Sequence, residues 1–305
     1  MEFRIPTPPR FSFKRTALSH GWSGLLPFEL NRDAWTLRRV LDLGEGVAPV
    51  TVQISGTDGD AINVSTSRRL NPRAVAGVTR DVRHMLRLDD DMAEFYVAVA
   101  SDPEFAWIAR DGAGRLLRSP TVFEDLVKSI CTTNCSWALT EKMVTSLVRH
   151  LGRATRDGRH AFPTPAAMAD APAEFYRDTM RAGYRAPYFK ELAARVVSGE
   201  LDVESWFESN LTTEELKREM KRVKGVGDYA AENLLKLVGR YDVLALDSWL
   251  RAKFARTRNA GRTAADAKII RYYRRFNSWR GLAIWCDMTR DWIEDNEELK
   301  AVDSK

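Results

Sequence analysis

The chain has 305 residues, a length typical of about two domains, each able to bury its own core. With 44% hydrophobic and 29% charged residues its composition is that of a folded globular protein, and no repeat or low-complexity segment interrupts it. Forty-seven Lys and Arg against 42 Asp and Glu give a net charge of +5, which indicates an anionic partner only where the excess is concentrated. No apolar run approaches the roughly 20 residues of a membrane span, and the first residues lack a signal-peptide pattern.

The first ten residues are rich in proline and are predicted to be extended, and residues 11–67 read as strands. Residues 50–54 and 62–64 are predicted to pair across the turn sequence Gly-Thr-Asp-Gly at 56–59. We therefore expect a small antiparallel β domain. Pro72 and the charged run at 86–91 favour a boundary near residue 85.

Helical patterns dominate from residue 92 onward, and the strongest are two amphipathic runs at 122–132 and 137–151. The turn between them contains Asn134 and Ser136. Either residue is a good N-cap for the second helix, so a capping role competes with a functional role for Asn134. Trp137 is predicted to be a core residue, as are Trp206 and Phe207 farther along.

Residues 216–239 read as two helices joined by a tight turn, Lys224-Gly225-Val226-Gly227. Asp228 is the predicted N-cap of the second helix, and Gly239 is placed to end it. Glycines permit positive φ and close approach to the backbone, so the free N–H groups of the turn can bind a phosphate oxygen. The alternative is that Gly-x-Gly only makes a tight corner between helices.

An apolar connection at 241–246 leads to Asp247, which precedes a helical run at 248–255. For a lone Asp in this position, a simple N-cap is the alternative to chemistry. The next stretch is strongly basic, with nine Lys and Arg and a single acid, Asp266, between residues 251 and 275. We interpret it as a phosphate-facing surface, against the alternative of an ordinary solvated helix face. Beyond it, Trp285 and Asp287 could approach the cleft, but we predict that they pack in a closing helix.

The order of helix, Gly-Val-Gly, helix, apolar loop, Asp247 and basic helix resembles the helix-hairpin-helix (HhH-GPD) superfamily of base-excision DNA glycosylases. The 3-methyladenine DNA glycosylase II and 8-oxoguanine glycosylase-like branches are the most similar. The resemblance implies an α+β fold, mainly α-helical, with two helical subdomains around a cleft. It places an N-terminal antiparallel β domain at 1–85 and the glycosylase domain at 86–305, with the hairpin at 216–239 and the catalytic loop at 240–248.

In that superfamily the loop aspartate is catalytic, so the resemblance implies that Asp247 positions or activates water and stabilises the cationic sugar. Bifunctional glycosylase/lyases carry a Schiff-base lysine two residues after the second glycine, where this chain has Tyr229. A phenol cannot form an imine, so we expect a monofunctional enzyme. Tyr229 resembles the aromatic residue of the alkylated-base branch, although a half-buried structural tyrosine is an equal alternative. Tyr229 and Trp249 are the expected walls of a pocket for an electron-poor alkylated base.

The resemblance also implies a DNA-binding set that comprises Lys224, Gly225, Val226, Gly227, Arg251 and Asn134, the last filling the gap left by the extruded base. Main-chain carbonyls of Lys221, Val223 and Val226 are expected to hold a structural Na⁺ or K⁺ ion. Lys224, which replaces the usual proline, is more probable as a DNA contact than as a nucleophilic amine. The segment 183–188 (GYRAPY) is expected to connect the two helical subdomains.

The three cysteines, Cys131, Cys135 and Cys286, lack the spacing of a disulfide framework or a zinc site. Only Cys286 lies near the C-terminus, where some superfamily members bind an iron–sulfur cluster with four cysteines, so no such cluster is expected. The chain is expected to be a monomer in a reducing compartment: cytoplasmic and nucleoid-associated in a bacterium, or nuclear in a eukaryote.

The sequence thus favours a monofunctional DNA glycosylase of base excision repair that flips a damaged, preferably alkylated, purine from duplex DNA and hydrolyses its N-glycosidic bond. One alternative is a glycosylase for oxidised or deaminated purines. Another is a non-catalytic DNA-binding protein that uses the same hairpin, and a third is an enzyme with lyase activity.

Overall fold

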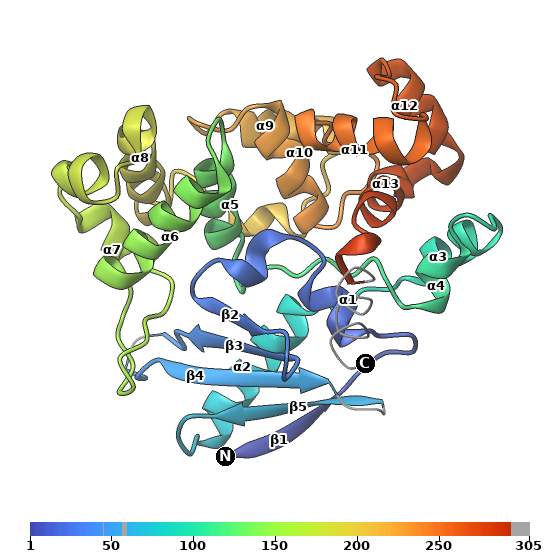
Figure 1. The fold of residues 1–305 in the computed structure, drawn as a ribbon. Helices are drawn as coiled ribbons and strands as arrows, with labels where there is room; N and C mark the ends of the chain where they lie inside the picture. The colour runs from blue at the N-terminus through green and yellow to red at the C-terminus, as the bar shows by residue number, and fades with distance from the viewer. Residues whose placement is uncertain (45, 57–59, 294–305) are drawn as a thin grey trace.

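The computed structural model describes residues 1–44, 46–56 and 60–293. Its N-terminal part forms a five-stranded antiparallel sheet in the order β1-β5-β4-β3-β2. The strands are β1 (Glu2–Pro6), β2 (Phe28–Asn31), β3 (Thr36–Leu41), β4 (Val50–Gly56) and β5 (Ala61–Thr66). Figure 1 shows the sheet as a lower layer, with most helices gathered above it.

Strand β4 shows why these residues form a sheet. Val50, Val52 and Ile54 alternate with more polar residues and are fully buried, as expected for a strand with one face on the core. Ile54 pairs with Val64 of β5, which confirms the predicted hairpin pairing. Residues 57–59 of its predicted turn lie outside the described residues.

The prediction of strands throughout residues 11–67 is wrong in one segment. Residues 13–24 form helix α1 (Phe13–Ala17) and a 3-10 turn (Gly21–Gly24). The Ser12 hydroxyl accepts the N–H of Arg15 at 3.3 Å and caps α1, so local capping decides the conformation there. This segment leads the chain out of the sheet toward the helices.

The remaining chain is helical, which confirms the predicted α+β fold. The helices are α2 (Pro72–Met85), α3 (Ala93–Ala100), α4 (Ala106–Arg110), α5 (Val122–Thr132), α6 (Trp137–Leu151), α7 (Pro165–Asp170), α8 (Ala186–Val197), α9 (Thr213–Lys221), α10 (Asp228–Leu237), α11 (Ser248–Arg258), α12 (Asp266–Tyr273) and α13 (Arg280–Met288). In Figure 1 one group contains α6, α7 and α8, the other α9 to α13, and α5 lies between them. No helix of the described ranges is both long and apolar enough to cross a membrane.

One hydrophobic core runs from the sheet into the helices, including Val52 of β4, Val82 of α2 and Leu126 of α5. The boundary near residue 85 coincides with the end of α2 but stays a prediction, because this core continues across it. Trp206 is buried as predicted, whereas Phe207 is half-buried with Arg118 over its ring.

A buried ion network joins the sheet to α5. Glu124 of α5 accepts hydrogen bonds from Arg39 of β3 at 2.5 and 3.0 Å and from Lys128 at 2.7 Å. All three side chains are at most 3% exposed. Burial alone would raise the pKa of Glu124, but the two adjacent cations outweigh burial and lower it to about 2.

The substitution Glu124→Gln should lower the free energy of unfolding by about 3 kcal/mol at pH 7, because it leaves two buried cations without a counter-ion. Urea denaturation measures the change, and Glu214→Gln in an exposed pair with Arg218 is the matched control, expected to cost under about 0.5 kcal/mol. Since the folded-state pKa of Glu124 is lowered, its stabilisation is present above the ordinary carboxyl range and is lost as pH falls toward 2. Equal stability of both variants at pH 7 would contradict the role of this network.

Candidate active site

The predicted hairpin is formed by α9 and α10. A capping box starts α9, in which Thr212 and Glu215 satisfy each other's backbone N–H groups. Gly227 is the N-cap of α10, so the prediction of Asp228 as the cap is wrong. Asp228 is the first helical residue, and its carboxylate lies 3.0 Å from Lys221, because the lysines of α9 attract it away from the helix end.

The two glycines of the hairpin turn differ in backbone conformation and in the space around them. Gly225 has φ +90°, and a Cβ there would lie 3.0 Å from the Tyr188 ring and 3.2 Å from Ile130. Gly227 has an ordinary φ of −89°, and a Cβ would meet nothing within 4 Å. The fold therefore requires Gly225 but not Gly227. The open space at Gly227 leaves the first amides of α10 accessible to a ligand.

The loop that leads to Asp247 is fastened to both neighbouring helices. Glu232 of α10 accepts the N–H of Ala245 at 2.8 Å. On the other side, Gly281 of α13 donates to the carbonyl of Tyr241 at 2.7 Å, and a Cβ at Gly281 would lie 1.8 Å from the Val243 oxygen. The loop is thus packed too closely against α13 to move independently.

Asp247 is the N-cap of α11, one of the two alternatives that the sequence left open, and its position is also compatible with the other, a chemical role. Its Oδ1 accepts the N–H of Leu250 at 2.6 Å and caps α11. The same residue lies on the wall of a cavity of about 500 Å³. Capping therefore orients the carboxylate at the cavity, which is large enough for a purine base.

The cavity is built from segments far apart in the chain. It is lined by three residues before β2, by residues of α5, α6 and α10, and by the tryptophans of the C-terminal helices: His20, Gly21, Trp22, Leu116, Ser129, Thr132, Cys135, Trp137, Thr140, Tyr229, Asn233, Lys236, Leu237, Asp247, Trp249, Trp285 and Trp292. The structure thus brings together the predicted residues Asp247, Tyr229 and Trp249.

Aromatic rings dominate the walls of this cavity. Tyr229 is 38% exposed, and burial of its ring, reinforced by the charge of Asp247, raises its pKa, so the phenol stays protonated. Trp249 lies with Trp285 and Trp292 in a cluster whose ring centroids are 5.9 to 6.2 Å apart. These rings offer stacking surfaces for a flat base.

Two tryptophans differ from their predicted places. Trp137, predicted as core, is 43% exposed and lines the cavity. The Gly21 backbone packs directly against its ring. Trp285, predicted to pack, also lines the cavity, with its indole N–H donating to the Ser19 carbonyl at 2.6 Å. Asp287 packs as predicted, bonded to Arg258 and Tyr273.

Asn134 lies at the tip of the α5–α6 turn in a left-handed conformation, with φ +47°. It is exposed, and its amide donates to the Tyr184 hydroxyl at 3.2 Å. Ser136 caps α6 by accepting the N–H of Leu139 at 3.4 Å, so the capping role does not fall to Asn134. Arg185 donates to Thr133 at 3.0 Å, so the 183–188 segment supports this turn.

Lys236 was not predicted from the sequence as a site residue. Its side chain is 2% exposed, and its ammonium lies 4.5 Å from the centroid of Trp285. Its Nζ has no hydrogen-bond partner among the described residues. Burial lowers its pKa to about 8, against the opposing charges of Asp247 and Glu232. Its position seven residues after Tyr229, on the same helix face, was the available signal.

His20 was also missed, since nothing in the local sequence links it to the hairpin. Burial lowers its pKa to about 3, so the ring is neutral. Its Nε2 contacts the Leu117 carbonyl, which can only accept, so Nε2 carries the proton and Nδ1 is an acceptor. The cavity wall therefore contains a neutral acceptor as well as an amine.

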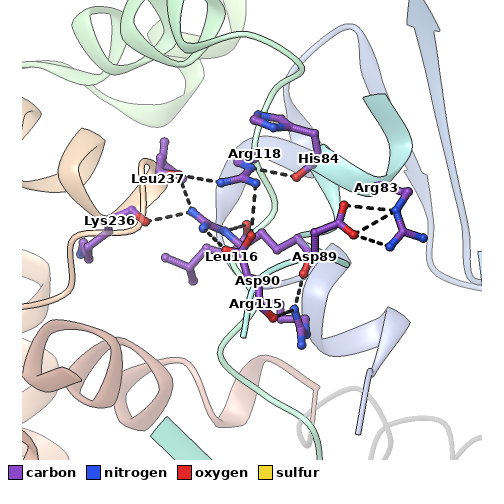
Figure 2. A network of polar contacts seen from close by, with 10 residues as sticks. Arg83, His84, Asp89, Asp90, Arg115, Leu116, Arg118, Lys236 and Leu237 are labelled. Atoms are coloured by element: carbon purple, nitrogen blue, oxygen red, sulfur yellow. Dashed lines mark hydrogen bonds and ion pairs between the residues drawn. The ribbon is translucent and has the colours of Figure 1, made fainter. Parts of the chain in front are cut away.

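A cluster of buried arginines holds the end of α10 (Figure 2). Arg87 donates to the carbonyls of Lys236, at 2.9 Å, and of Leu237. Asp90 pairs with Arg87 at 2.7 Å and with Arg118 at 3.3 Å. Figure 2 shows the Lys236 side chain pointing away from these arginines while its carbonyl faces them.

The predicted DNA-binding residues Lys224 and Arg251 both form ion pairs with acids of the protein. Lys224 pairs with Glu191 at 2.7 Å, and Arg251 pairs with Asp266 at 2.8 Å. Several neighbours in the basic stretch are also paired with acids from other segments: Lys253, Arg258 and Arg275. Within the basic stretch 251–275, all of which the structure describes, the exposed arginines that form no ion pair are Arg256, Arg262, Arg271 and Arg274.

The three cysteines are free thiols. Cys131 and Cys286 are free and buried, and burial raises the pKa of Cys286 to about 12. The Val223 carbonyl accepts the N–H of Val226 at 3.1 Å. A carbonyl oxygen has a second lone pair, so this turn is compatible with the predicted cation ligands.

Comparison with known proteins agrees with this geometry. No protein-family model matches the chain. A relative from Methanothermobacter thermautotrophicus, named probable N-glycosylase/DNA lyase, is 24% identical over 218 residues, which are 64% of this chain and 68% of the relative.

Two solved structures share the fold over nearly the whole chain. The 3-methyladenine DNA glycosylase of Archaeoglobus fulgidus aligns with a TM-score of 0.74 and 22% identity, covering 94% of this chain and 97% of that one. The 8-oxoguanine glycosylase/lyase of Clostridium acetobutylicum aligns with a TM-score of 0.72 and 20% identity, covering 94% and 95%. These matches show that the chain has the fold of DNA glycosylases, and the Gly-Val-Gly hairpin followed by Asp247 is similar to the motif of the helix-hairpin-helix superfamily.

Proposed function

We propose that this protein flips a damaged purine out of duplex DNA into the cavity and cleaves its N-glycosidic bond with the help of Asp247. The observation that carries the proposal is the position of Asp247 on the cavity wall, in a loop fastened to α10 and α13. Base chemistry of this kind requires extrusion of the nucleotide, since the reacting atom is unreachable inside the duplex.

In this mechanism the carboxylate of Asp247 faces C1′ of the extruded sugar. As the bond to the base breaks, its electron pair leaves with the base, which is protonated, and positive charge develops on the sugar. A fixed carboxylate in a mostly aromatic cavity stabilises that charge strongly. The capping bond to Leu250 keeps the carboxylate oriented before the substrate arrives.

The hairpin would hold the DNA strand beside this cavity. Amides at the start of α10 would bind a phosphate through the open space at Gly227, and Asn134 would enter the gap in the stack. If the turn also holds a Na⁺ or K⁺ ion, the carbonyls of Lys221, Val223 and Val226 would be its ligands.

The cavity favours a neutral oxidised purine over the alkylated purine expected from Tyr229. A cationic alkylated base would meet the buried ammonium of Lys236, which already occupies the face of Trp285. An oxidised purine such as 8-oxoguanine is neutral and adds an N–H and a carbonyl next to each other. Lys236 offers a donor and His20 an acceptor for such a pair. The fold shared with the 8-oxoguanine glycosylase/lyase of Clostridium acetobutylicum supports the same choice.

A panel of duplexes carrying one damaged base each tests the substrate. We expect release of 8-oxoguanine at least about tenfold faster than release of 3-methyladenine, because like charges repel in a buried site. Free base is quantified by mass spectrometry, without alkali. Faster release of the cationic base would restore the alkylated-purine interpretation and contradict our assignment.

The substitution Asp247→Asn should reduce base release by about 100- to 10,000-fold while leaving DNA affinity unchanged. Asn is as good an N-cap as Asp, so α11 should keep its start and the protein its stability. Single-turnover release assays measure the rate, and Asp266→Asn in the exposed pair with Arg251 is the control. An unchanged rate in Asp247→Asn would eliminate the catalytic role.

The substitution Gly227→Val should weaken binding to damaged and undamaged duplexes alike, on the order of tenfold, because phosphate contacts carry no sequence information. Stability should fall by no more than about 1 kcal/mol, since a Cβ at Gly227 meets no protein atom within 4 Å and the loss is confined to a poorer N-cap of α10. Fluorescence anisotropy gives the affinity, and Gly227→Ala should fall between wild type and Val. A change confined to one damaged base would instead place Gly227 in the base pocket.

A further inference from the structure

We propose that Lys236 is a catalytic amine, and that the protein cleaves the DNA strand after base removal through a Schiff base between Lys236 and C1′ of the sugar. This inference rests on the proposed function, because it assumes that a nucleotide enters the same cavity. It assigns to Lys236 the role that Tyr229 is chemically unable to fill.

Lys236 has the required location. It lines the same cavity as Asp247, and it lies on the face of α10 that also presents Tyr229 and Asn233 to that cavity. Seven residues separate Lys236 from Tyr229, which is two helical turns, or about 10 Å along the axis. Side chains on a helix lean toward its N-terminus, so a long lysine side chain extends back toward the position of Tyr229.

The surroundings of Lys236 favour a chemical role over a structural one. It interrupts an apolar stretch of α10, next to the buried Leu234, Leu235 and Leu237, where a leucine would pack at no electrostatic cost. Its Nζ forms no hydrogen bond within the part of the chain that the structure describes. A buried amine without a hydrogen bond, in a cavity that also contains a carboxylate, is typical of catalytic groups.

Two further features favour Lys236 as a nucleophile: its main chain is fixed and the pKa of its amine is lowered. Arg87 fixes the main chain by binding its carbonyl, while the side chain points the other way (Figure 2). Burial lowers the pKa of Lys236 to about 8, so the neutral, nucleophilic form is more populated near neutral pH than for an exposed lysine. Asp247, which lines the same cavity, is the first acid whose charge acts on this amine and opposes the lowering of its pKa.

The other lysines of the hairpin do not meet these conditions. Lys224 is 62% exposed and pairs with Glu191. Lys217 and Lys221 both pair with Asp228 at 3.0 Å. Among the described residues that line the cavity, Lys236 is the single lysine.

The reaction balances with water as the only co-reactant. The neutral amine attacks C1′, and the C1′–N9 bond breaks with its electron pair leaving on the base, which takes a proton. The sugar ring opens as the C1′–O4′ bond breaks and O4′ is protonated, which gives an iminium. Loss of a C2′ proton then expels the 3′ phosphate as the C3′–O bond breaks. Water finally hydrolyses the imine and returns the Lys236 amine.

Borohydride trapping on two duplexes tests this proposal. One duplex carries 8-oxoguanine and the other a preformed abasic site, which needs no base recognition. Wild type should form a covalent adduct with both, and peptide mass spectrometry should locate it on Lys236. Lys236→Met should lose the adduct and should cleave abasic DNA on the order of 100-fold more slowly without alkali. Lys142→Gln, an exposed lysine of α6, should behave as wild type.

Lys236→Met removes a buried amine without a partner, so it should fold at least as well as wild type, which urea denaturation checks. If it fails to fold, the site of the wild-type adduct decides the question alone. Base release by wild type without any trapped adduct would overturn the lyase proposal and leave the proposed glycosylase intact. An adduct on another residue would also overturn it. Absence of base release together with trapping on abasic DNA would instead contradict the proposed substrate.

Discussion

The position of the Asp247 loop depends on two contacts made by the carboxylate of Glu232. One oxygen pairs with Lys217 of α9 at 2.6 Å, and the other accepts the N–H of Ala245 at 2.8 Å. Ala245 has φ +52°, an unfavourable conformation for a residue with a side chain, so the loop needs such an anchor. Glu232 therefore joins both hairpin helices to the loop and fixes the distance between the DNA-facing turn and Asp247.

The arginine cluster does the same for the other end of α10. The last carbonyls of a helix have no partner within it, and here Arg87 and Arg118 donate to them from the core. These guanidinium groups satisfy the last carbonyls of α10. The amine of Lys236 therefore does not have to donate to them, and it lines the cavity instead. Asp90 balances their charge, which allows the cluster to remain buried. The cavity thus receives one acid and one amine, each fixed by contacts outside it.

In our proposal the amine lies away from the motif position at which glycosylase/lyases carry the Schiff-base lysine. Tyr229 presents an aromatic wall at the rim, and the amine lies two helical turns deeper on the same face. A helix allows such a change, since residues seven apart point in nearly the same direction. The motif residue alone predicted no lyase activity, whereas the cavity as a whole supports one. In our two proposals the same amine opposes cationic bases and attacks the sugar, so a single lysine would link substrate choice to the type of cleavage.

The sequence by itself determined the features that depend on neighbouring residues. Alternation specified β4 and its pairing with β5, and the glycine turn and apolar stripes specified the hairpin and the approach to Asp247. Only the tertiary structure decided which side chains share the cavity, because His20, Trp137, Lys236 and Trp285 come from segments up to 265 positions apart, from His20 to Trp285. The tertiary structure also decided which basic side chains form ion pairs. The sequence suggested Arg251 as a phosphate ligand, whereas in the structure Arg251 pairs with Asp266. Burial and charge pairing depend on three-dimensional neighbours, which no local pattern specifies.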